Sequence, residues 1–342
     1  MIRVAIVGLG WAGQRQLEAA GELGRKIAVT CLVDPDGDHL QGVTAPAGTE
    51  RLTDYSAALA DPKIDAVSIC TPHNHHAPMA VAAAEAGKHV LVEKPMALTV
   101  AEADQMLAAA AANNVQLYVA ENASYTPRAR FLRTVVTEER LIGPLTAAAV
   151  TAGFRAPNFG YPGRRAWLTD PAHGGTGTWM LHGVHTVAEL RYILGEVKTV
   201  YLCEHKTASF ERRDLEGTMS GLLTLHNGLA VSILQSSETK FYGDSGGYTL
   251  YGETGILRGG QEGYRLFNGE ADYLTAPFVP YPTQPLSSYA LELEAFADYI
   301  SGAAIGPTTG ASERQSLAIV QAGYESVASG LPVPVGSLAT RD

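Results

Sequence analysis

Short apolar runs alternate with stretches of helical periodicity along the first third of the chain. The runs predict five strands, at Arg3–Val7, Ile27–Val33, Ile64–Cys70, His89–Val92 and Gln116–Ala120. The helical patterns lie between them, near Gly13–Leu23, Tyr55–Ala60, His76–Ala86 and Val100–Asn113. The last of these helices should begin with a capping box, in which Thr99 and Glu102 satisfy free backbone donors. Strands that alternate with helices at this spacing predict a parallel sheet with right-handed crossovers, in an α/β domain over residues 1–122.

The pattern changes after residue 122, where strands follow one another with only turns between them. Five are predicted, at Leu145–Phe154, Thr199–Thr207, Gly217–His226, Leu229–Ser236 and Tyr248–Gly252. The pair Asn227-Gly228 predicts a hairpin with a type I′ turn, because that turn needs positive φ at both central residues. Consecutive hairpins predict a second, α+β domain over residues 123–342 with a large, mainly antiparallel sheet.

Three helices are predicted in this second domain, near Trp179–Leu194, Ser288–Ser301 and Glu313–Ser329. We expect them to cover one face of the antiparallel sheet, and the last could also pack back on the first domain. That last helix should begin with a capping box at Ser312. The other face of the sheet is then left for contacts between subunits, which predicts a homo-dimer or homo-tetramer.

Composition narrows the class of protein. The 342 residues suffice for two domains, and 46% apolar with 18% charged residues is typical of a folded globular chain. A formal net charge of −10 argues against a general nucleic-acid binder and against attraction to an anionic membrane. No apolar run approaches the ~20 residues of a membrane span, and the N-terminus enters a strand pattern without a signal-peptide layout. Cys31, Cys70 and Cys203 are far apart in the sequence, so we expect reduced thiols in a cytoplasmic protein.

The first predicted strand ends in Gly8-Leu9-Gly10-Trp11-Ala12-Gly13, directly before a helical pattern. In such a turn the first glycine permits the tight bend, the second lets the backbone approach a pyrophosphate, and the third lets the helix pack closely on the strand. The helix N-terminus then faces the phosphates with N–H groups and a favourable dipole. We therefore predict a Rossmann domain with a doubly wound sheet, whose dinucleotide contacts are Gly8, Gly10, Trp11, Ala12 and Gly13.

Asp34 follows the second predicted strand, at the place where the carboxylate of a Rossmann domain hydrogen-bonds the adenosine ribose. An acid at this place repels a 2′-phosphate, so NAD rather than NADP is the predicted cofactor. The alternative is that Asp34 belongs only to a turn, since Asp34-Pro35-Asp36-Gly37 has the composition of one.

The segment Cys70-Thr71-Pro72-His73-Asn74-His75-His76 follows a later strand, at the sheet edge where ligands bind in doubly wound folds. We predict cofactor contacts for Thr71, Pro72, Asn74 and His76; capping of the following helix is the alternative. The histidines suggest a metal site, but their spacing is poor and no cysteine or carboxylate cluster accompanies them. No metal is predicted.

The next strand leads into Glu93-Lys94-Pro95, which places Lys94 at the carboxyl edge of the sheet. With this block the chain resembles the Gfo/Idh/MocA family, which includes glucose-fructose oxidoreductase, inositol dehydrogenase and related NAD(P)-dependent oxidoreductases. The resemblance covers nearly the whole chain. Besides the glycine motif, it rests on Thr71-Pro72, Ala86-Gly87-Lys88-His89-Val90, Glu93-Lys94-Pro95, Glu121-Asn122, Trp167, Gly174-Gly175, Gly183-Val184-His185 and Leu194-Gly195.

The resemblance implies roles for individual residues. Lys94 is similar to the family's catalytic lysine, which precedes a proline that is often cis, and Glu93 would lie at the cofactor. His185 is similar to the histidine that takes or gives the substrate proton, and Asn122 and Tyr125 stand where the family lines the nicotinamide and substrate pocket. Structural alternatives stay open, because Lys94 could cap a loop and His185 could be a core histidine.

Two positions depart from the family's pattern. The aspartate often found four residues before the histidine is Leu181 here, and the acid often found three residues after it is Ala188. His182 lies beside the first gap and could take over the proton relay, or His185 and Lys94 could suffice; a structural or substrate-contacting role for His182 is the alternative. A histidine that titrates near neutrality suits removal of a carbinol proton, and a lysine ammonium stabilises developing alkoxide charge.

The loop before Trp167 is rich in arginine and aromatic residues and predicts part of a substrate pocket. Tyr161 and Trp167 could stack on the C–H face of a pyranose or cyclitol. Arg155, Arg164 or Arg165 could bind hydroxyl or acid groups. A solvated surface loop is the alternative.

Together with the resemblance, these residues predict an enzyme of carbohydrate metabolism. It would transfer a hydride between NAD and a secondary alcohol or ketone of a sugar, inositol or related polyol, as sugar and inositol dehydrogenases do. Two alternatives stay open: a redox-neutral, NAD-dependent enzyme of the glycosidase type, and a non-catalytic regulator of the same fold that senses the dinucleotide. The presence of both Lys94 and His185 argues against the regulator.

Overall fold

The computed structural model describes residues 1–139, 141–153, 163–212, 214–239, 246–269 and 275–336. The chain forms two compact units. The first consists of residues 1–125, 162–175 and 285–317, and the second of residues 126–161, 176–284 and 318–342. Two segments from the later part of the sequence therefore belong with the N-terminal unit.

The first unit is built on a six-stranded parallel sheet in the order β3-β2-β1-β4-β5-β6. Its strands are β1 (Ile2–Val7), β2 (Ile27–Val33), β3 (Glu50–Leu52), β4 (Ala66–Ile69), β5 (His89–Glu93) and β6 (Leu117–Ala120). The predicted parallel sheet is confirmed, although β3, which has no buried side chain, was not among the predicted strands. The order reverses between β1 and β4, and ligands of such folds bind outside the carboxyl ends of the strands at this point.

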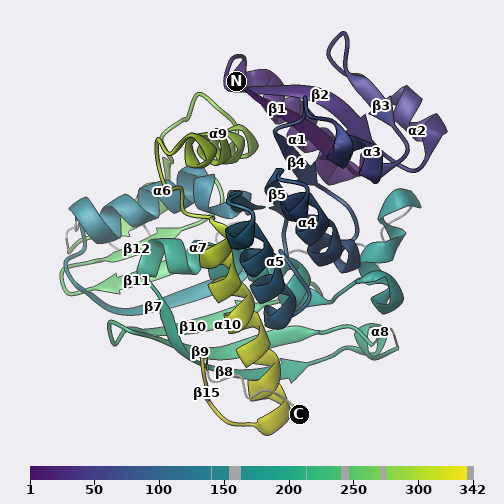
Figure 1. Cartoon of the computed structure of the whole chain (residues 1–342). Coiled ribbons are helices and arrows are strands. Elements are labelled where there is room, and N and C mark those ends of the chain that lie inside the picture. The colour runs from purple at the N-terminus through teal and green to yellow at the C-terminus, as the bar shows by residue number, and fades with distance from the viewer. Residues whose placement is uncertain (140, 154–162, 213, 240–245, 270–274, 337–342) are drawn as a thin grey trace. The chain divides into compact units, whose positions relative to one another are not determined.

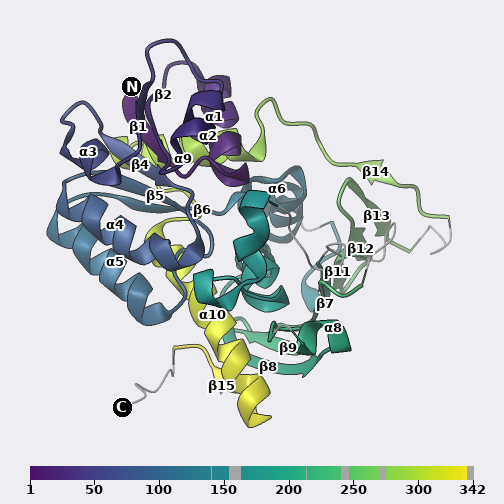
Figure 2. The same ribbon diagram turned by 90° about the vertical axis from the view of Figure 1, so that its right-hand side faces the viewer.

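Helices cover both faces of this sheet, as Figures 1 and 2 show. They are α1 (Trp11–Leu23), α2 (Gly37–Gly42), α3 (Tyr55–Ala60), α4 (His76–Glu85), α5 (Val100–Ala112) and α9 (Ser288–Ser301). Helix α1 packs against α9 on one face, and α4 packs against α5 on the other. Thr99 Oγ1 accepts from the Glu102 N–H and the Glu102 carboxylate accepts from the Thr99 N–H, so the predicted capping box of α5 is confirmed.

Helix α9 belongs to the first unit, so the prediction that it covers the antiparallel sheet is wrong. Its apolar stripe, in which Leu293 and Phe296 are buried, joins a core formed with residues of β1, β2 and α1. The helical period in the sequence identifies a stripe that must be buried, but it does not identify the sheet that receives it.

The second unit is built on a nine-stranded sheet in the order β14-β13-β12-β11-β7-β10-β9-β8-β15. Its strands are β7 (Leu145–Ala152), β8 (Val197–His205), β9 (Thr218–Leu225), β10 (Ala230–Gln235), β11 (Gly247–Gly252), β12 (Ile256–Gly259), β13 (Gly263–Phe267), β14 (Val279–Pro280) and β15 (Val333–Pro334). Neighbouring strands run antiparallel except β7 and β10, so the predicted mainly antiparallel sheet is confirmed. One buried row crosses five strands in register: Val200, Leu223, Val231, Ala148 and Leu250.

The predicted hairpin between β9 and β10 is present, but its turn is not of type I′. The Gly228 N–H donates to the Leu225 carbonyl oxygen at 3.0 Å, which makes His226 and Asn227 the central residues. Gly228 has positive φ, and Asn227 is not among the described residues that do. A single left-handed glycine after the turn also suits the twist of a hairpin, so Asn-Gly indicated the hairpin and not its turn type.

The helices of the second unit cover one face of its sheet. They are α6 (Pro127–Thr134), α7 (Val184–Leu194), the short α8 (Ala208–Glu211) and the part of α10 (Gly310–Ser329) that follows residue 317. Trp179, buried just before α7, donates from its indole N–H to the Val320 carbonyl oxygen at 2.9 Å and so joins this face to α10. Helix α10 begins earlier than predicted, because Thr309 Oγ1 accepts from the Ser312 N–H at 3.2 Å; Thr309 and not Ser312 caps it.

None of the described helices combines the length and the apolar character that a bilayer-spanning helix needs.

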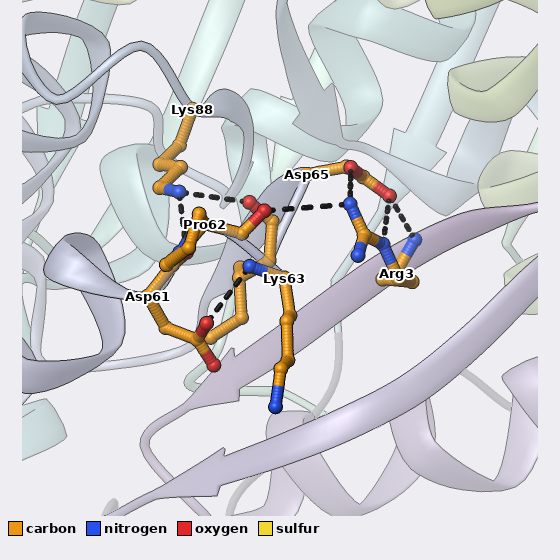
Figure 3. Close-up of polar contacts among 7 residues, drawn as sticks. Arg3, Asp61, Pro62, Lys63, Asp65 and Lys88 are labelled. Atoms are coloured by element: carbon orange, nitrogen blue, oxygen red, sulfur yellow. Dashed lines mark hydrogen bonds and ion pairs between the residues drawn. The ribbon is translucent and has the colours of Figure 1, made fainter.

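A polar network closes the amino end of the parallel sheet (Figure 3). Arg3 in β1 donates from its backbone N–H and from Nε to the Asp65 carboxylate, at 2.8 and 2.9 Å. Lys88, which precedes β5, is only 7% exposed, and its ammonium donates to the carbonyl oxygens of Asp61 and Ile64 at 2.7 and 2.9 Å. These contacts tie β1, β4 and β5 together at the end of the sheet opposite to their carboxyl ends.

Lys88→Met should destabilise the protein, because it removes a buried donor from two backbone carbonyl oxygens while keeping most of the side chain's length. We expect the free energy of unfolding, measured by urea denaturation, to fall by about 1–3 kcal/mol. Lys63→Met, at an exposed lysine of the same network, is the matched control and should change it by less than ~0.5 kcal/mol. Equal effects of the two variants would show that the Lys88 contacts do not stabilise the sheet.

Candidate functional site

The glycine loop after β1 leaves no room for a side chain at two of its positions. Gly8 has a φ of +87°, and a Cβ there would lie 2.7 Å from the Cys70 carbonyl oxygen. A Cβ at Gly13 would lie 2.0 Å from the Gly8 carbonyl oxygen, which shows how closely α1 packs on the loop. A Cβ at Gly10 would have no described atom within 4 Å, so the backbone at Gly10 borders open space.

The start of α1 suits the pyrophosphate of a dinucleotide. The helix begins at Trp11, and its N-cap Gly10 provides no side-chain cap for the first turn. Backbone N–H groups and the positive end of the helix dipole therefore lie beside the open space at Gly10, as anion binding requires. The predicted contacts Gly8, Gly10, Trp11, Ala12 and Gly13 thus belong to one turn with the shape of a phosphate-binding loop.

Asp34 lies directly after β2 and is 1% exposed. Its Oδ2 accepts a hydrogen bond from the Leu9 N–H at 2.8 Å, and its Oδ1 accepts one from the Asp36 N–H at 3.1 Å. On the other side of Leu9, His39 Nε2 lies 2.8 Å from the Leu9 carbonyl oxygen. Asp34 therefore holds the glycine loop in place; its bond to a ribose stays a prediction, and His39 is a neighbour that the motif did not identify.

The segment after β4 forms a short 3-10 turn over His73–His75 and then enters α4. Thr71 and Pro72 are half-buried and Asn74 is exposed. His76 is fully buried, with Nδ1 2.8 Å from the Pro95 carbonyl oxygen and Nε2 2.9 Å from that of Thr71. A neutral imidazole donates to only one of these oxygens. His76 thus connects this segment to the residue after Lys94, and the predicted cofactor contacts stay predictions.

His73 and Trp167 form a contact that the sequence did not reveal. The rings lie edge to face with centroids 4.7 Å apart, and His73 donates from Nδ1–H to the Gly174 carbonyl oxygen at 2.9 Å. Burial, with additional repulsion from His76 and Lys94, holds the pKa of His73 well below its usual range, so the ring is neutral. Trp167 was expected in the second domain, but it lies in the first unit beside the segment after β4.

Lys94 directly follows β5 at the carboxyl edge, and the Lys94–Pro95 peptide bond is cis. Its charge acts on four titratable neighbours: Glu93, Glu121, His73 and His76. Burial of the carboxyl groups raises the pKa of both Glu93 and Glu121 to about 7, while the Lys94 ammonium opposes that rise. The predicted catalytic lysine thus lies beside two carboxyl groups that titrate near neutrality, as the groups of acid–base sites often do.

Asn122 and Tyr125 lie in a short turn after β6. Asn122 is half-buried and hydrogen-bonds the Tyr289 hydroxyl of α9. Tyr125 is 8% exposed, and its hydroxyl lies 2.6 Å from that of Tyr118 and 3.4 Å from that of Thr308. Both residues therefore join β6 to segments near the end of the chain, and their predicted place in the nicotinamide and substrate pocket is not tested by these contacts.

His182 and His185 belong to the second unit and are both half-buried. His182 lies in a π-helical turn over Trp179–Gly183, and His185 lies in the first turn of α7. His182 Nδ1 is 3.2 Å from Ser237 Oγ. Single π turns within helices often mark functional sites, and here the turn contains His182 and leads directly into the first turn of α7, which contains His185.

Glu216 holds the start of that π turn through hydrogen bonds, a role that the sequence did not indicate. Its carboxylate accepts hydrogen bonds from the N–H groups of Gly177 and Met180 and from the Tyr324 hydroxyl of α10. A Cβ at Gly177 would lie 2.2 Å from the Glu216 backbone nitrogen, so glycine is required for the approach. Glu216 therefore helps to position the segment that carries His182.

Arg155 and Tyr161, predicted to bind substrate, lie outside the described residues. Arg164 lies in a short 3-10 helix over Gly163–Thr169, and its side chain is not described. Within the described part of the chain, no three histidine, cysteine or acidic side chains are grouped so as to hold a metal ion.

Two family models match the chain. The NAD-binding Rossmann fold of the Gfo/Idh/MocA oxidoreductase family matches residues 2–121, and the C-terminal alpha/beta domain of the same family matches residues 138–335.

Individual relatives are similar over most of their length. The uncharacterized oxidoreductase YrbE of Bacillus subtilis is 26% identical over 341 residues, which are 98% of this chain and 96% of the relative. The 1,5-anhydro-D-fructose reductase of Ensifer adhaerens is 26% identical over 290 residues, 82% and 83% of the two chains. A levoglucosan dehydrogenase in complex with NADH and levoglucosan superposes with a TM-score of 0.84 at 20% identity, over 98% of this chain and 99% of that chain. At that identity the solved structure establishes a shared fold.

Gly10→Ala should leave the fold intact and weaken dinucleotide binding. The φ of −67° at Gly10 suits alanine, and the added methyl group enters the open space where a pyrophosphate would approach. We expect the Kd for NADH, from fluorescence titration, to rise about tenfold or more with little change in Tm. Gly21→Ala, at an unhindered position of the same helix, is the control and should bind as wild type does. Wild-type affinity of the Gly10 variant would show that the phosphates do not pass over this residue.

Proposed function

The chain belongs to the Gfo/Idh/MocA family of NAD(P)-dependent oxidoreductases, and we propose that it transfers a hydride between NAD and a secondary alcohol, or the matching ketone, of a sugar, inositol or related polyol. Family membership supports the general activity. The choice of NAD, the substrate class and the roles of individual residues are the content of the proposal.

One arrangement in the first unit carries the proposal. The glycine loop follows β1, Asp34 follows β2 and Lys94 follows β5, so all three lie at the carboxyl edge of one parallel sheet. This edge is where doubly wound folds bind dinucleotides, on both sides of the point where the strand order reverses. The loop supplies a place for phosphates, and Lys94 supplies a cation on the far side of the reversal point.

The chemistry divides between the cofactor and the chain. When bound, NAD supplies the hydride acceptor. The chain must take up the carbinol proton and stabilise the charge that develops on the carbinol oxygen. We assign the stabilisation to the Lys94 ammonium and the proton to His185, with His182 beside it in sequence in place of the family's aspartate. In the direction of reduction the same groups return the proton and polarise the ketone.

NAD is proposed over NADP because of the charge at the end of β2. Asp34, Asp36 and Asp38 lie within five residues, and a 2′-phosphate there would meet several carboxylates. A carboxylate can accept several hydrogen bonds, so the role of Asp34 in holding the loop is compatible with a bond to a ribose hydroxyl.

The substrate class rests on the relatives and on the side chains available. Two of the three proteins compared above have names that refer to anhydrosugars. Trp167, half-buried beside His73, provides an aromatic surface that could face the C–H groups of a sugar ring.

We also propose that the enzyme is cytoplasmic and that it forms a homo-dimer or homo-tetramer through the sheet of the second unit. Tyr201 and Leu222, adjacent in register, are exposed on its open face.

Lys94→Met should abolish most turnover while leaving dinucleotide binding nearly unchanged, because it removes the ammonium and keeps the length of the side chain. With a substrate found by screening NAD-linked absorbance across sugars, inositols and sugar acids, we expect kcat to fall about 100-fold or more. The Kd for NADH should change less than about threefold. Lys63→Met is the control for loss of a surface charge.

Three outcomes would contradict this proposal. Unchanged turnover in Lys94→Met would remove Lys94 from the mechanism. Cofactor absorbance that stays with the purified protein through turnover, without net NADH formation, would favour the redox-neutral enzyme. Binding of the dinucleotide without turnover on any member of the panel would favour the regulator.

Asp34→Asn should reduce the preference for NAD, since it removes the charge that repels a 2′-phosphate and keeps a side-chain oxygen as acceptor. We expect the ratio of kcat/KM for NAD to that for NADP to fall about tenfold or more. Asp38→Asn, at an exposed acid in the first turn of α2, is the matched control and should change the ratio much less. An unaltered ratio in Asp34→Asn would show that the ribose assignment is wrong.

A further inference from the structure

Three buried carboxyl groups from distant parts of the sequence lie in the region of Lys94 in the first unit. Glu93 ends β5, Glu121 follows β6, and Glu292 comes from α9. Gln16 of α1 joins two of them, because its Nε2 lies 3.0 Å from Glu292 Oε1 and 3.4 Å from Glu93 Oε1. The oxygens of Glu93 and Glu292 that share this amide are therefore at most 6.4 Å apart, the sum of the two distances.

The contacts of Glu292 suit a negative charge poorly. The residue is 0% exposed, and among the described residues no hydrogen-bond partner reaches its Oε2 or Gln16 Oε1. An ionised carboxylate with one oxygen buried and unpartnered is costly. A proton on Oε2 turns that oxygen into a donor and removes the charge, so the contacts favour a neutral acid.

Several titratable groups face Glu292. They are Glu93 and Glu121 at the ends of β5 and β6, Cys70 after β4, Tyr118 in β6, Tyr125 in the turn after β6, and Tyr289 on its own helix. Burial raises the pKa of Glu292 well above its usual range, and the charges of Glu93 and Glu121 raise it further. Among the described residues, the Lys94 ammonium acts on Glu93 and Glu121 and opposes the rise of their pKa values.

We propose that Glu292 is a positioning residue for the reaction: it holds a proton at neutral pH, releases it at higher pH, and through Gln16 and Glu93 sets how much negative charge faces the Lys94 amine. The part that concerns turnover rests on the proposed role of Lys94. The part that concerns the charge at Lys94 does not, since it depends only on groups within the first unit.

The direction of the effect follows from the charges. As pH rises, Glu93 and Glu121 ionise first and Glu292 last, so the cluster gains negative charge in steps that belong to the group as a whole. Each added charge favours the ammonium form of Lys94 and raises the pH at which that form is lost. If the ammonium is the active form, the ionisation of Glu292 moves the alkaline limb of the kcat/KM profile to higher pH.

Glu292→Gln tests the inference, since it keeps the shape and the acceptor for Gln16 but never carries a charge. We expect the alkaline limb of the kcat/KM profile to move to lower pH by about one unit, the shift that one charge produces at ~10 Å and an effective dielectric constant near 20. At neutral pH, where wild-type Glu292 is protonated, kcat should stay within about threefold of wild type. Glu294→Gln, at an acid of the same helix that pairs with Lys26, is the control and should leave the limb in place.

A second measurement does not need turnover. Lysines of the full chain are methylated with carbon-13, the Lys94 resonance is assigned by its absence in Lys94→Met, and its pKa is measured by NMR titration in wild type and Glu292→Gln. A pKa of Lys94 lower by about one unit in the variant supports the inference even if the substrate class proposed above is wrong. An unshifted pKa overturns it. So does a Glu292→Gln enzyme that loses activity equally at every pH, because that result indicates a structural role alone.

The wild-type protein gives a check that does not depend on the variant's folding. The inference requires that a buried carboxylic acid stay protonated at pH 7, visible as a C=O stretch in the infrared spectrum that disappears on titration to higher pH. Absence of any such band at pH 7 overturns it.

Discussion

The first unit depends on the approach of three backbone segments at the end of β1. The Gly8 backbone lies so close to the Cys70 carbonyl oxygen, and Gly13 so close to Gly8, that neither position has space for even one methyl group. This contact sets the start of α1 against the end of β4, and the Asp34 carboxylate then fixes the Leu9 N–H between them. Backbone and buried polar contacts hold this loop at Gly8, Leu9 and Gly13, so a dinucleotide that binds beside Gly10 does not have to order it.

The local parts of this arrangement were predictable from the sequence, and the non-local parts were not. The glycine motif and the Thr99 capping box each act within a few residues, so their patterns identify them. The attachment of α9 to the parallel sheet and the contact of Trp167 with His73 join residues far apart in the chain. Periodicity and composition describe a segment's own faces and contain no information about which distant surface covers them.

Two predictions about single residues were wrong for a related reason. Thr309 rather than Ser312 caps α10, and the Asn227-Gly228 hairpin has positive φ only at its glycine. In both cases several residues in a row satisfy the same local rule, and packing elsewhere selects among them. Glu292 is the clearest omission at the candidate site, because it lies in an ordinary amphipathic helix and acquires its importance only from the buried groups that face it.

One position in the second unit departs from the family's pattern. Where the family often has an aspartate, this chain has Leu181, and the neighbouring His182 contacts the Ser237 hydroxyl instead. A carboxylate would fix the histidine's tautomer and stabilise its protonated form, whereas a hydroxyl both donates and accepts and adds no charge. Under the proposed assignment of the proton to His185 and of alkoxide stabilisation to Lys94, Leu181 in place of that aspartate leaves more of the stabilisation to the lysine. Lys94 is suited to that larger share, since Glu93 and Glu121 favour its ammonium while His73, kept neutral by burial, adds no competing positive charge.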